Sequence, residues 1–354
     1  MEAGIAGAGI VGRLLAFSLL HAGWKVSLFD QDTKEGRKSC SGVAAGLLTP
    51  FSELDKSPTS VAKLGWVAIQ QDWPEILSLL SCPVLLRKGG SLVVAHPRDQ
   101  VEFPLFLRRL ASRWSPECYQ QLDKEALHQL EPALSRFQGA CYFPEEASID
   151  TQAVFQRLGH YLTEHGVEWH SNTPVQSVDS GQIVLNEGLF ECDMAFDCRG
   201  LGGRASFEQL RGVRGELAIV SAPDVSLQHI LRLLHPRISL YIVPCPPFRY
   251  IIGASEIESE DFSEISIRTL LELLTAAYSV HPGFGEARIL ATRTQCRPTL
   301  PHSIPQIKWK QNFLAINGLY RYGYLLSPTL VKDVMQFLKD GMGAVQYPEY
   351  WKEQ

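Results

Sequence analysis

Residues 1–32 of the chain read MEAGIAGAGIVGRLLAFSLLHAGWKVSLFDQD, and this stretch decides the fold. A short apolar run leads into the glycine motif GAGIVG at 7–12. An apolar helical pattern follows over 10–22, and a second strand-like run at 26–29 ends in Asp30. The order of strand, turn, helix and strand with a terminal acid is typical of a dinucleotide-binding unit.

Each glycine of this motif has a physical role. Gly7 permits the tight turn, Gly9 lets the backbone approach a pyrophosphate, and Gly12 lets helix and sheet pack closely. The start of the helix offers unpaired N–H groups and a partial positive charge to phosphates. Asp30 stands where a carboxylate accepts hydrogen bonds from a ribose diol. The sequence therefore predicts a bound dinucleotide.

Composition narrows the function classes. The chain has 354 residues, of which 45% are hydrophobic and 20% charged, with a net charge of −5. It is long enough for two domains with sizeable cores. Because no basic stripe is available to neutralise phosphates, nucleic acid is not expected as a partner. No run of eighteen apolar residues is present, so no membrane span is expected.

The cysteines indicate a reducing compartment. None forms a C-x-x-C pair, and no group of cysteine and histidine has metal-ligand spacing, so no metal site is expected. The N-terminus is apolar but lacks the basic segment of a secretion signal. We therefore expect a cytoplasmic location with reduced thiols at Cys40, Cys82, Cys118, Cys141, Cys192, Cys198, Cys245 and Cys296.

The run SCSGVAAGLLTP at 39–50 suits backbone that passes tightly against a flat ring or a diphosphate. Two other features favour FAD over a nicotinamide cofactor. Only one glycine motif of this type is present, whereas flavin enzymes reduced by pyridine nucleotides often carry a second. A late strand–turn–helix pattern at 313–338 would cap a long, extended ligand.

The remaining patterns predict the architecture. A buried strand at 194–198 runs into the glycine cluster at 199–203, as in a second strand of the same parallel sheet. The middle of the chain is strand-rich with one covering helix, a pattern typical of an antiparallel sheet. A helix over 59–80 and a hairpin around 88–90 are also expected. The predicted fold class is α/β, with a Rossmann-type FAD-binding domain and an inserted antiparallel-sheet substrate domain. We expect the FAD-binding domain to comprise 1–80, 140–210 and 300–354, and the substrate domain 81–139 and 211–299.

At this point the chain resembles the D-amino-acid oxidase family of FAD oxidoreductases, and within it the glycine oxidases of thiamine biosynthesis. The resemblance covers nearly the whole chain in the family's order. It rests on the segments GIAGAGIVG, SCSGVAAGLL, NTPVQSV, FDCRGLGGR, GVRGE, LYIVP, IIGASE, CRPTLP and NGLYRYGYLLSPTLV.

The resemblance implies which residues hold the cofactor. FAD, bound non-covalently, would contact the first glycine loop, the acid and the small-residue run, with Val175 near the adenine. The implied residues are Gly7, Gly9, Ile10, Val11, Gly12, Asp30, Gln31, Ser41, Ala44, Ala45, Gly46, Leu47, Val175, Cys198, Gly200, Arg297, Tyr320, Arg321, Tyr322, Gly323, Tyr324 and Leu325. The last helix would present backbone N–H groups to the flavin C2 carbonyl and stabilise an anionic reduced flavin.

The same resemblance implies Tyr241, Arg297 and Arg321 as the catalytic residues. Tyr241 and Arg297 match the family's carboxylate-binding pair, since a guanidinium fork binds a carboxylate bidentately and a phenol adds one donor. From the residues alone, Tyr241 also fits a half-buried strand tyrosine and Arg297 a surface ion pair.

The implied activity is oxidative deamination of glycine or a similar small amino acid. The products would be an imino acid and hydrogen peroxide, with oxygen as the acceptor and the thiazole branch of thiamine biosynthesis as the destination. Sarcosine and small D-amino acids remain alternative substrates. A quinone-linked D-amino-acid dehydrogenase and a flavoprotein with a binding role remain alternative functions. An oxidase of a modified tRNA base is disfavoured by the acidic charge balance. The resemblance also allows a homo-oligomer.

The chain departs from the family pattern at several places. Asp30 stands where the family more often has Glu, and Cys198-Arg199 replaces small residues. Tyr320, Tyr322 and Tyr324 crowd the last turn. Some sarcosine oxidases bind flavin covalently through a cysteine comparable to Cys296, but the match to the glycine oxidase motif favours a buried free thiol here.

Overall fold

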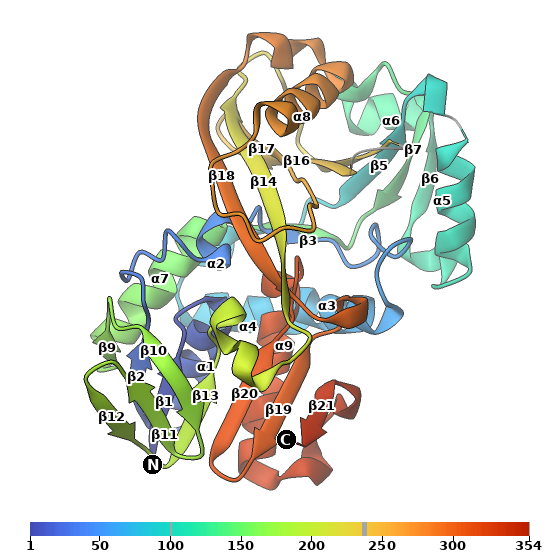
Figure 1. The fold of residues 1–354 in the computed structure, drawn as a ribbon. Helices are drawn as coiled ribbons and strands as arrows, with labels where there is room; N and C mark the ends of the chain where they lie inside the picture. The colour runs from blue at the N-terminus through green and yellow to red at the C-terminus, as the bar shows by residue number, and fades with distance from the viewer. Residues whose placement is uncertain (100, 236–238, 354) are drawn as a thin grey trace.

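The computed structural model describes residues 1–99, 101–235 and 239–353, and two large sheets divide the molecule into two parts (Figure 1). The lower part in this view holds both termini. The predicted domain ranges also cover residues 100, 236–238 and 354, which lie outside the described residues.

The lower sheet is built around the first strand of the chain. Neighbouring strands are parallel except for β19 and β20, which are antiparallel. The predicted second strand of this sheet is present, because Ala3 of β1 pairs with Met194 of β13. The seven strands lie in the order β21 (Trp351–Glu353), β19 (Gln306–Lys310), β20 (Phe313–Asn317), β13 (Met194–Asp197), β1 (Glu2–Ala6), β2 (Lys25–Phe29) and β9 (Glu168–His170).

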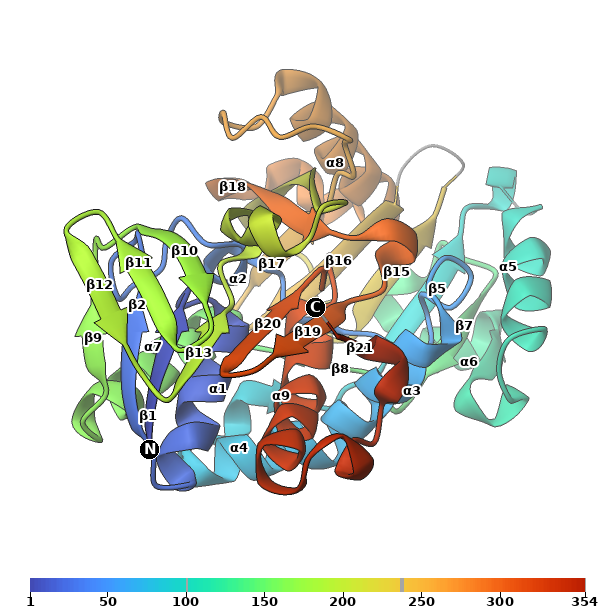
Figure 2. The same ribbon diagram turned by 60° about the horizontal axis from the view of Figure 1, so that its bottom comes forward.

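Both faces of this sheet are covered. Helix α1 (Ile10–His21) packs with α7 (Thr151–Glu164) and α9 (Gly323–Asp340) on one face (Figure 2). The other face carries a small antiparallel sheet of β10 (Val175–Asp179), β11 (Gln182–Leu185) and β12 (Gly188–Glu191). Because α1 is enclosed between the sheet and two helices, its side chains are buried on nearly every side.

The upper sheet has eight strands and is mostly antiparallel, as predicted. One pair, β5 with β15, is parallel, which the prediction of an antiparallel sheet missed. The order is β18 (Arg288–Thr299), β14 (Arg211–Ser221), β17 (Arg249–Gly253), β16 (Ser239–Cys245), β15 (Ile230–Leu234), β5 (Ser91–Ala95), β7 (Gly139–Phe143) and β6 (Gln120–Asp123).

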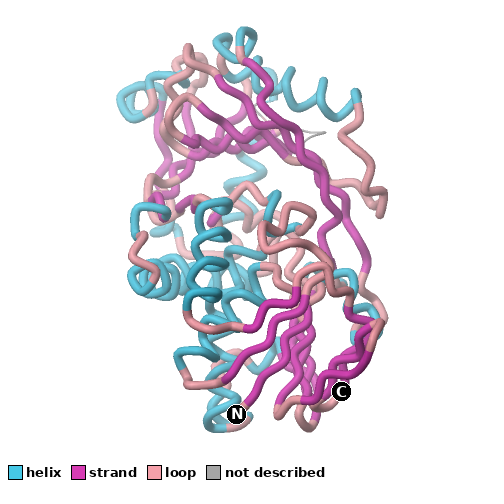
Figure 3. The backbone as a smooth tube through the Cα atoms, turned by 90° about the vertical axis from the view of Figure 1, so that its left-hand side faces the viewer, coloured by secondary structure: helices cyan, strands magenta, loops and turns pink. Residues whose placement is uncertain are grey.

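Side chains alternate across this upper sheet. In β16, Leu240 and Ile242 pack in the core beneath α8 (Ile267–Val280), whereas Tyr241 and Val243 lie on the opposite face. This period of two is the reason that Tyr241 faces the lower part of the molecule. Strands β14 and β18 are the longest of the sheet and extend downward toward the lower sheet (Figure 3).

The remaining elements are short. The helices are α2 (Cys40–Val43), α3 (Thr59–Val67), α4 (Trp73–Leu79), α5 (Glu102–Ala111) and α6 (Lys124–Leu130), and a third small sheet comprises β3 (Leu47–Leu48), β8 (Ala147–Ile149) and β4 (Leu86–Arg87). The helix expected over 59–80 is present as α3 and α4, joined by a π-helical turn at Ala68–Asp72. No helix in the described part of the chain is long and apolar enough to cross a bilayer.

Two local predictions need correction. The hairpin expected around 88–90 is wrong, because β4 pairs with β8 and β5 pairs with β7 and β15. The turn residues correctly indicated that one strand ends and another begins here. Each of these strands, however, pairs with strands that lie far along the chain. The boundary expected at 140 cuts through β7, which pairs with β5 and β6. We propose that the two large sheets mark the two domains, with this boundary moved beyond residue 143.

Candidate active site

Two adjoining cavities lie where the two sheets meet. The glycine-loop cavity, of about 1390 Å³ including its open mouth, begins at Gly7 and Asp30. The inner cavity, of about 1160 Å³ on the same measure, lies against the upper sheet and contains Tyr241. The two form one elongated space because both are lined by Ile10, Cys40, Ser41, Gln295, Tyr320 and Gly323.

The glycine loop has the geometry of a close backbone approach. Gly7 has φ of +98°, and a Cβ added there would lie 2.5 Å from the Cys198 carbonyl oxygen. A Cβ added at Gly12 would lie 1.9 Å from the Gly7 carbonyl oxygen. A Cβ at Gly9 would meet nothing closer than Ser41 Oγ at 3.4 Å. Gly7 and Gly12 therefore serve packing, and Gly9 leaves space beside the cavity.

A carboxylate and a helix N-terminus face this cavity together. Asp30 Oδ2 accepts from Ala8 N at 2.5 Å, and Asp30 Oδ1 accepts from Asp32 N at 2.7 Å. Burial raises the pKa of Asp30 above its ordinary value. Ser41 Oγ accepts from Ile10 N at 2.9 Å at the start of α1. An elongated cavity with an acid and a helix start at one end fits the ribose and pyrophosphate of FAD.

Arg13 supports this loop from below, and the sequence reading did not single it out. Its side chain is fully buried and donates to the carbonyl oxygens of Ala8 at 2.9 Å, Phe155 at 2.7 Å and Lys34 at 2.5 Å. Burial lowers the pKa of Arg13 to about 10. The sequence did contain a signal, because Arg13 is a charged residue within an otherwise apolar helix. A charged side chain is rarely buried unless it has partners.

Nearly all predicted cofactor residues line one of the two cavities. The exceptions are Gly12, which packs against the loop, and Val175. The Val175 carbonyl accepts from Arg199 Nη1 at 2.8 Å, and Arg199 in turn lines the glycine-loop cavity. The residues on the cavities are Gly7, Gly9, Ile10, Val11, Asp30, Gln31, Ser41, Ala44, Ala45, Gly46, Leu47, Cys198, Gly200, Arg297, Tyr320, Arg321, Tyr322, Gly323, Tyr324 and Leu325.

Tyr241 brings an unused donor to the inner cavity. The residue is 6% exposed, and its buried hydroxyl makes no well-aligned hydrogen bond among the described residues, although the Glu53 carboxylate lies beside it. Burial raises the pKa of Tyr241 well above its ordinary value, so the phenol keeps its proton. A buried hydroxyl without a partner is costly and is therefore a candidate ligand contact.

Arg297 brings a cation that has no ion pair within the described residues and interacts with Glu256 only from a longer distance. Its guanidinium lies over Gly215, where an added Cβ would be 2.1 Å from Nη2. It donates to the Ser255 carbonyl oxygen at 3.1 Å and has no ion pair within the described residues. Burial lowers the pKa of Arg297, because the charged form is poorly solvated there. An anion bound in the inner cavity would supply the missing counterion.

Arg321 is different, because two carboxylates already neutralise it. Its Nε lies 2.9 Å from Glu53 Oε2, and its Nη1 pairs with Glu256 Oε1. Burial alone would lower the pKa of Arg321, but Glu53 and Glu256 raise it above its ordinary value. Arg321 lines the inner cavity, but its charge is already paired with protein carboxylates.

The three tyrosines of the last turn also surround the inner cavity. Burial raises the pKa of Tyr320 and of Tyr322 to about 12. Tyr324 Oη donates to the Ser41 carbonyl oxygen at 3.1 Å. Helix α9 begins beside them at Gly323, with no side-chain cap and no acidic residue in its first turn. Its free N–H groups therefore lie at the cavity that both sheets share.

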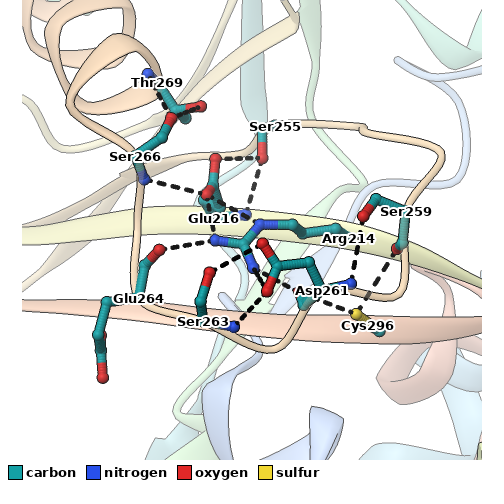
Figure 4. A network of polar contacts seen from close by, with 10 residues as sticks. All are labelled: Arg214, Glu216, Ser255, Ser259, Asp261, Ser263, Glu264, Ser266, Thr269 and Cys296. Carbon is teal, nitrogen blue, oxygen red and sulfur yellow. Dashed lines mark hydrogen bonds and ion pairs between the residues drawn. The ribbon is translucent and has the colours of Figure 1, made fainter.

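Cys296 belongs to a polar network on the other side of β18 (Figure 4). Its thiol points toward the carbonyl oxygens of Ser259 at 3.7 Å and Asp261 at 3.5 Å. The same network contains the buried ion pair of Arg214 Nη2 and Glu216 Oε1 at 2.6 Å. Cys296 lines the glycine-loop cavity but not the inner cavity, and the contact of its thiol with these backbone carbonyl groups favours the non-covalent alternative.

Several cavity residues were missed by sequence reasoning. Arg293 and Gln295 alternate with Arg297 along β18, and this period of two could have revealed them. Gly215 lay in a matched segment but was given no role. The partners Glu53 and Glu256 had no local signal, because their contact with Arg321 depends on the tertiary fold. Among the described residues, no group of three or more His, Cys, Asp or Glu is arranged to hold a metal.

The family profile described as FAD dependent oxidoreductase, DAO, matches residues 2–335. The chain belongs to this family. A Rhizobium etli protein, ThiO, provisionally named a thiamine biosynthesis oxidoreductase, is 36% identical over 338 residues, which cover 95% of this chain and 96% of the relative. The glycine oxidase of Bacillus licheniformis is 25% identical over 341 residues, covering 92% and 89%.

A solved structure agrees with the fold. The crystal structure of glycine oxidase from Geobacillus kaustophilus superposes with a TM-score of 0.85 at 22% sequence identity, covering 99% of this chain and 97% of that one. The predicted fold class is confirmed. The chain is an FAD-dependent oxidoreductase of the glycine oxidase and D-amino-acid oxidase type.

Proposed function

We propose that this enzyme oxidises glycine, or an amino acid of similar size, to the imino acid. The observation that carries the proposal is the inner cavity itself. Within the described residues it contains a cation with no ion pair, Arg297, and a buried phenol with no well-aligned hydrogen bond, Tyr241. A carboxylate is the ligand that completes both groups at once.

The binding groups determine how the substrate lies. Arg297 donates bidentately to the substrate carboxylate, and Tyr241 adds a directional hydrogen bond. With the carboxylate fixed at one end, the Cα–H bond is held in one orientation within the cavity, and this positioning lowers the entropic part of the barrier. FAD, held by the residues that line the glycine-loop and inner cavities, would supply the two-electron oxidation of the amine, with oxygen as the final acceptor and hydrogen peroxide as the product.

Proton handling follows from what lines the cavity. The described lining residues of the inner cavity include no histidine and no lysine. The carboxylates there, Glu53 and Glu256, are paired with Arg321. We infer that the substrate amine reacts in its unprotonated form without a protein base. Activity should therefore rise with pH toward the pKa of the bound amine.

Several finer assignments are part of this proposal. Supply of the thiazole branch of thiamine biosynthesis is supported by the similarity to ThiO, which is named for that pathway. A cytoplasmic location is supported by the eight cysteines, which are all described and all free. Arg321, with Glu53 and Glu256, is proposed to shape the cavity wall, where the two carboxylates compensate its positive charge.

The test is a spectrum of the FAD-loaded protein with anaerobic glycine in the same cuvette. We expect the flavin bands to bleach with glycine and return with air. Bleaching that is reversed only by a quinone analogue would replace the oxidase with a dehydrogenase. A flavin indifferent to glycine, sarcosine and small D-amino acids would refute the proposal. Arg297→Met should raise the glycine concentration needed for half-maximal bleaching at least about tenfold.

A further inference from the structure

A third cavity opens from the inner cavity. This side cavity, of about 710 Å³ including its mouth, shares part of its lining with the inner cavity and none with the glycine-loop cavity. The shared lining comprises Val43, Ala44, Ala45, Leu217, Val243, Ile251 and Arg293. Whatever occupies the side cavity is therefore in reach of the inner cavity but separate from the dinucleotide end.

The side cavity carries excess positive charge. Arg87, Arg249 and Arg293 line it, and Asp150 is the only acidic residue among its described lining residues. Asp150 already caps α7 by accepting from Ala153 N at 3.1 Å, and it lies 3.7 Å from Arg87 Nη2. Within the described residues, Arg249 and Arg293 have no ion pair. Arg249 is exposed at the mouth of the cavity, whereas Arg293 is half-buried and is the cation that most needs a counterion.

Arg293 also belongs to the row of residues that contains Tyr241. Across the sheet, Tyr241 pairs with Gly253, Gly253 pairs with Leu217, and Leu217 pairs with Arg293. Three strand spacings separate the two ends of the row, or about 14 Å between Cα atoms. Gly253 has no side chain, so only the side chain of Leu217 stands between them. Arg293 and Tyr241 therefore lie on the same face of the sheet, at the two ends of one row.

Arg297 reaches toward this row as well. Its guanidinium lies over Gly215, which pairs with Gln295 and stands two residues before Leu217. The head of Arg297 is therefore displaced along the sheet toward Arg293, by about the 7 Å rise of two strand residues. A small molecule whose first carboxylate is bound by Arg297 and Tyr241 could therefore extend along the sheet and place its other end near Arg293.

We propose that Arg293 and Arg249 form a second carboxylate subsite beside the substrate site. The inference rests on the proposed function, because the first carboxylate is placed at Arg297 and Tyr241. The ligand class is a carboxylate. It comes either from the substrate itself, as the second acid group of a dicarboxylic amine, or from a separate acid such as the released oxo acid. In both cases charge-assisted hydrogen bonds from guanidinium hold it.

The first arm of the test compares matched substrates. N-(carboxymethyl)glycine differs from sarcosine, and D-aspartate from D-alanine, by one carboxylate. Anaerobic flavin reduction gives the second-order rate constant for each, and the ratio within a pair reports the second subsite. If the carboxylate belongs to the substrate, Arg293→Gln and Arg249→Gln should each lower at least one ratio about fivefold or more, and Arg293→Lys should recover part of it.

The second arm tests a separate acid, with malonate as the probe. Malonate that binds only at Arg297 inhibits glycine-dependent reduction competitively. Malonate that also binds at the side cavity gives mixed inhibition. We expect Arg293→Gln to weaken the non-competitive part of this inhibition about fivefold. Arg288→Gln is the matched control, because Arg288 lies on the same strand, is exposed and lines none of the three cavities.

The outcomes separate this inference from the proposed function. Two results together would overturn the subsite. The ratios of rate constants stay within twofold of wild type in both variants, and malonate inhibits the wild-type enzyme in a purely competitive way. If no amine reduces the flavin, calorimetry of malonate binding to the FAD-loaded enzyme still tests it. Two sites per chain, with one lost in Arg293→Gln, support the subsite, and one site unaffected by the substitution refutes it. Flavin content and melting temperature establish that each variant is folded.

Discussion

Gly215→Ala tests the carboxylate site through a position that no substrate touches. A Cβ at residue 215 would lie 2.1 Å from Arg297 Nη2, 2.2 Å from Cζ and 2.5 Å from Nη1. An ordinary van der Waals contact begins near 3.4 Å, so the guanidinium must move by roughly 1 Å or more. The backbone at Gly215 has ordinary strand geometry and can accept alanine, since its φ is not positive.

The expected loss follows from that displacement. A misplacement of about 1 Å in a positioning group can lower the rate about 100-fold, which corresponds to about 2.7 kcal/mol. The same size is expected from losing one or two charge-assisted hydrogen bonds at about 1.5 to 3 kcal/mol each. We therefore expect kcat/KM for glycine to fall about 100-fold. The unfolding free energy should change by less than about 1 kcal/mol, because the clash falls on the end of a flexible side chain.

The assay is steady-state oxygen consumption with glycine, alongside flavin content and thermal unfolding. Gly89→Ala is the control, because an added Cβ at Gly89 meets nothing within 4 Å. Arg297→Met and the double variant complete a cycle. If Gly215→Ala acts through Arg297, the double variant is no slower than Arg297→Met alone. Full activity of a folded, flavin-loaded Gly215→Ala, or losses that simply add in the double variant, would refute the reasoning.

Three further changes test other parts of the site. Tyr241→Phe removes the unpartnered phenol, and kcat/KM for glycine should fall about five- to tenfold, mainly through KM, at unchanged flavin content. Arg13→Met removes three buried hydrogen bonds to backbone carbonyls, so calorimetric unfolding should show a loss of about 3 kcal/mol or more and weaker FAD retention. Burial raises the pKa of Glu146 to about 7, so the folded state holds its proton where the unfolded state has released it. Protonated Glu146 therefore contributes on the order of 3 kcal/mol to the free energy of unfolding. This stabilisation is fully present below pH 4.5 and is lost as the pH rises to about 7. Glu146→Gln can keep the carboxylate's contacts with Ser91 and two backbone N–H groups, so denaturant titrations should show that this fall with pH has disappeared.

The dinucleotide end of the molecule was predictable because its signal is local. Gly7, Gly9 and Gly12 stand at fixed spacing between a strand and a helix, and backbone sterics alone dictate their roles. Likewise, side chains in β16 alternate between the two faces of the sheet, and this alternation alone directs Tyr241 toward the cavity. Such features need no knowledge of distant partners.

What could not be predicted depends on distant partners. Residues 86 and 91 looked like two sides of a hairpin, yet they belong to different sheets whose other strands lie far along the chain. The ion pairs of Arg321 with Glu53 and Glu256 join residues separated by 268 and 65 positions. Sequence showed that three cationic or phenolic side chains were present in matched segments. It could not show which of them would already be neutralised.

The difference between ion-paired and unpaired arginines determines the charge distribution in the site. The wall segment at 51–55 places its acids against arginines, since Glu53 pairs with Arg321, and Asp55 lies 2.7 Å from Arg232 Nη1. Each of these pairs largely cancels its own charges, and Glu256 adds one further negative charge beside Arg321. The cationic groups of the inner cavity that have no ion pair among the described residues lie on β18, at Arg293 and Arg297. A carboxylate entering the cavity meets ion-paired carboxylates on one side and these guanidinium groups on the other, and that asymmetry orients it before any chemistry occurs.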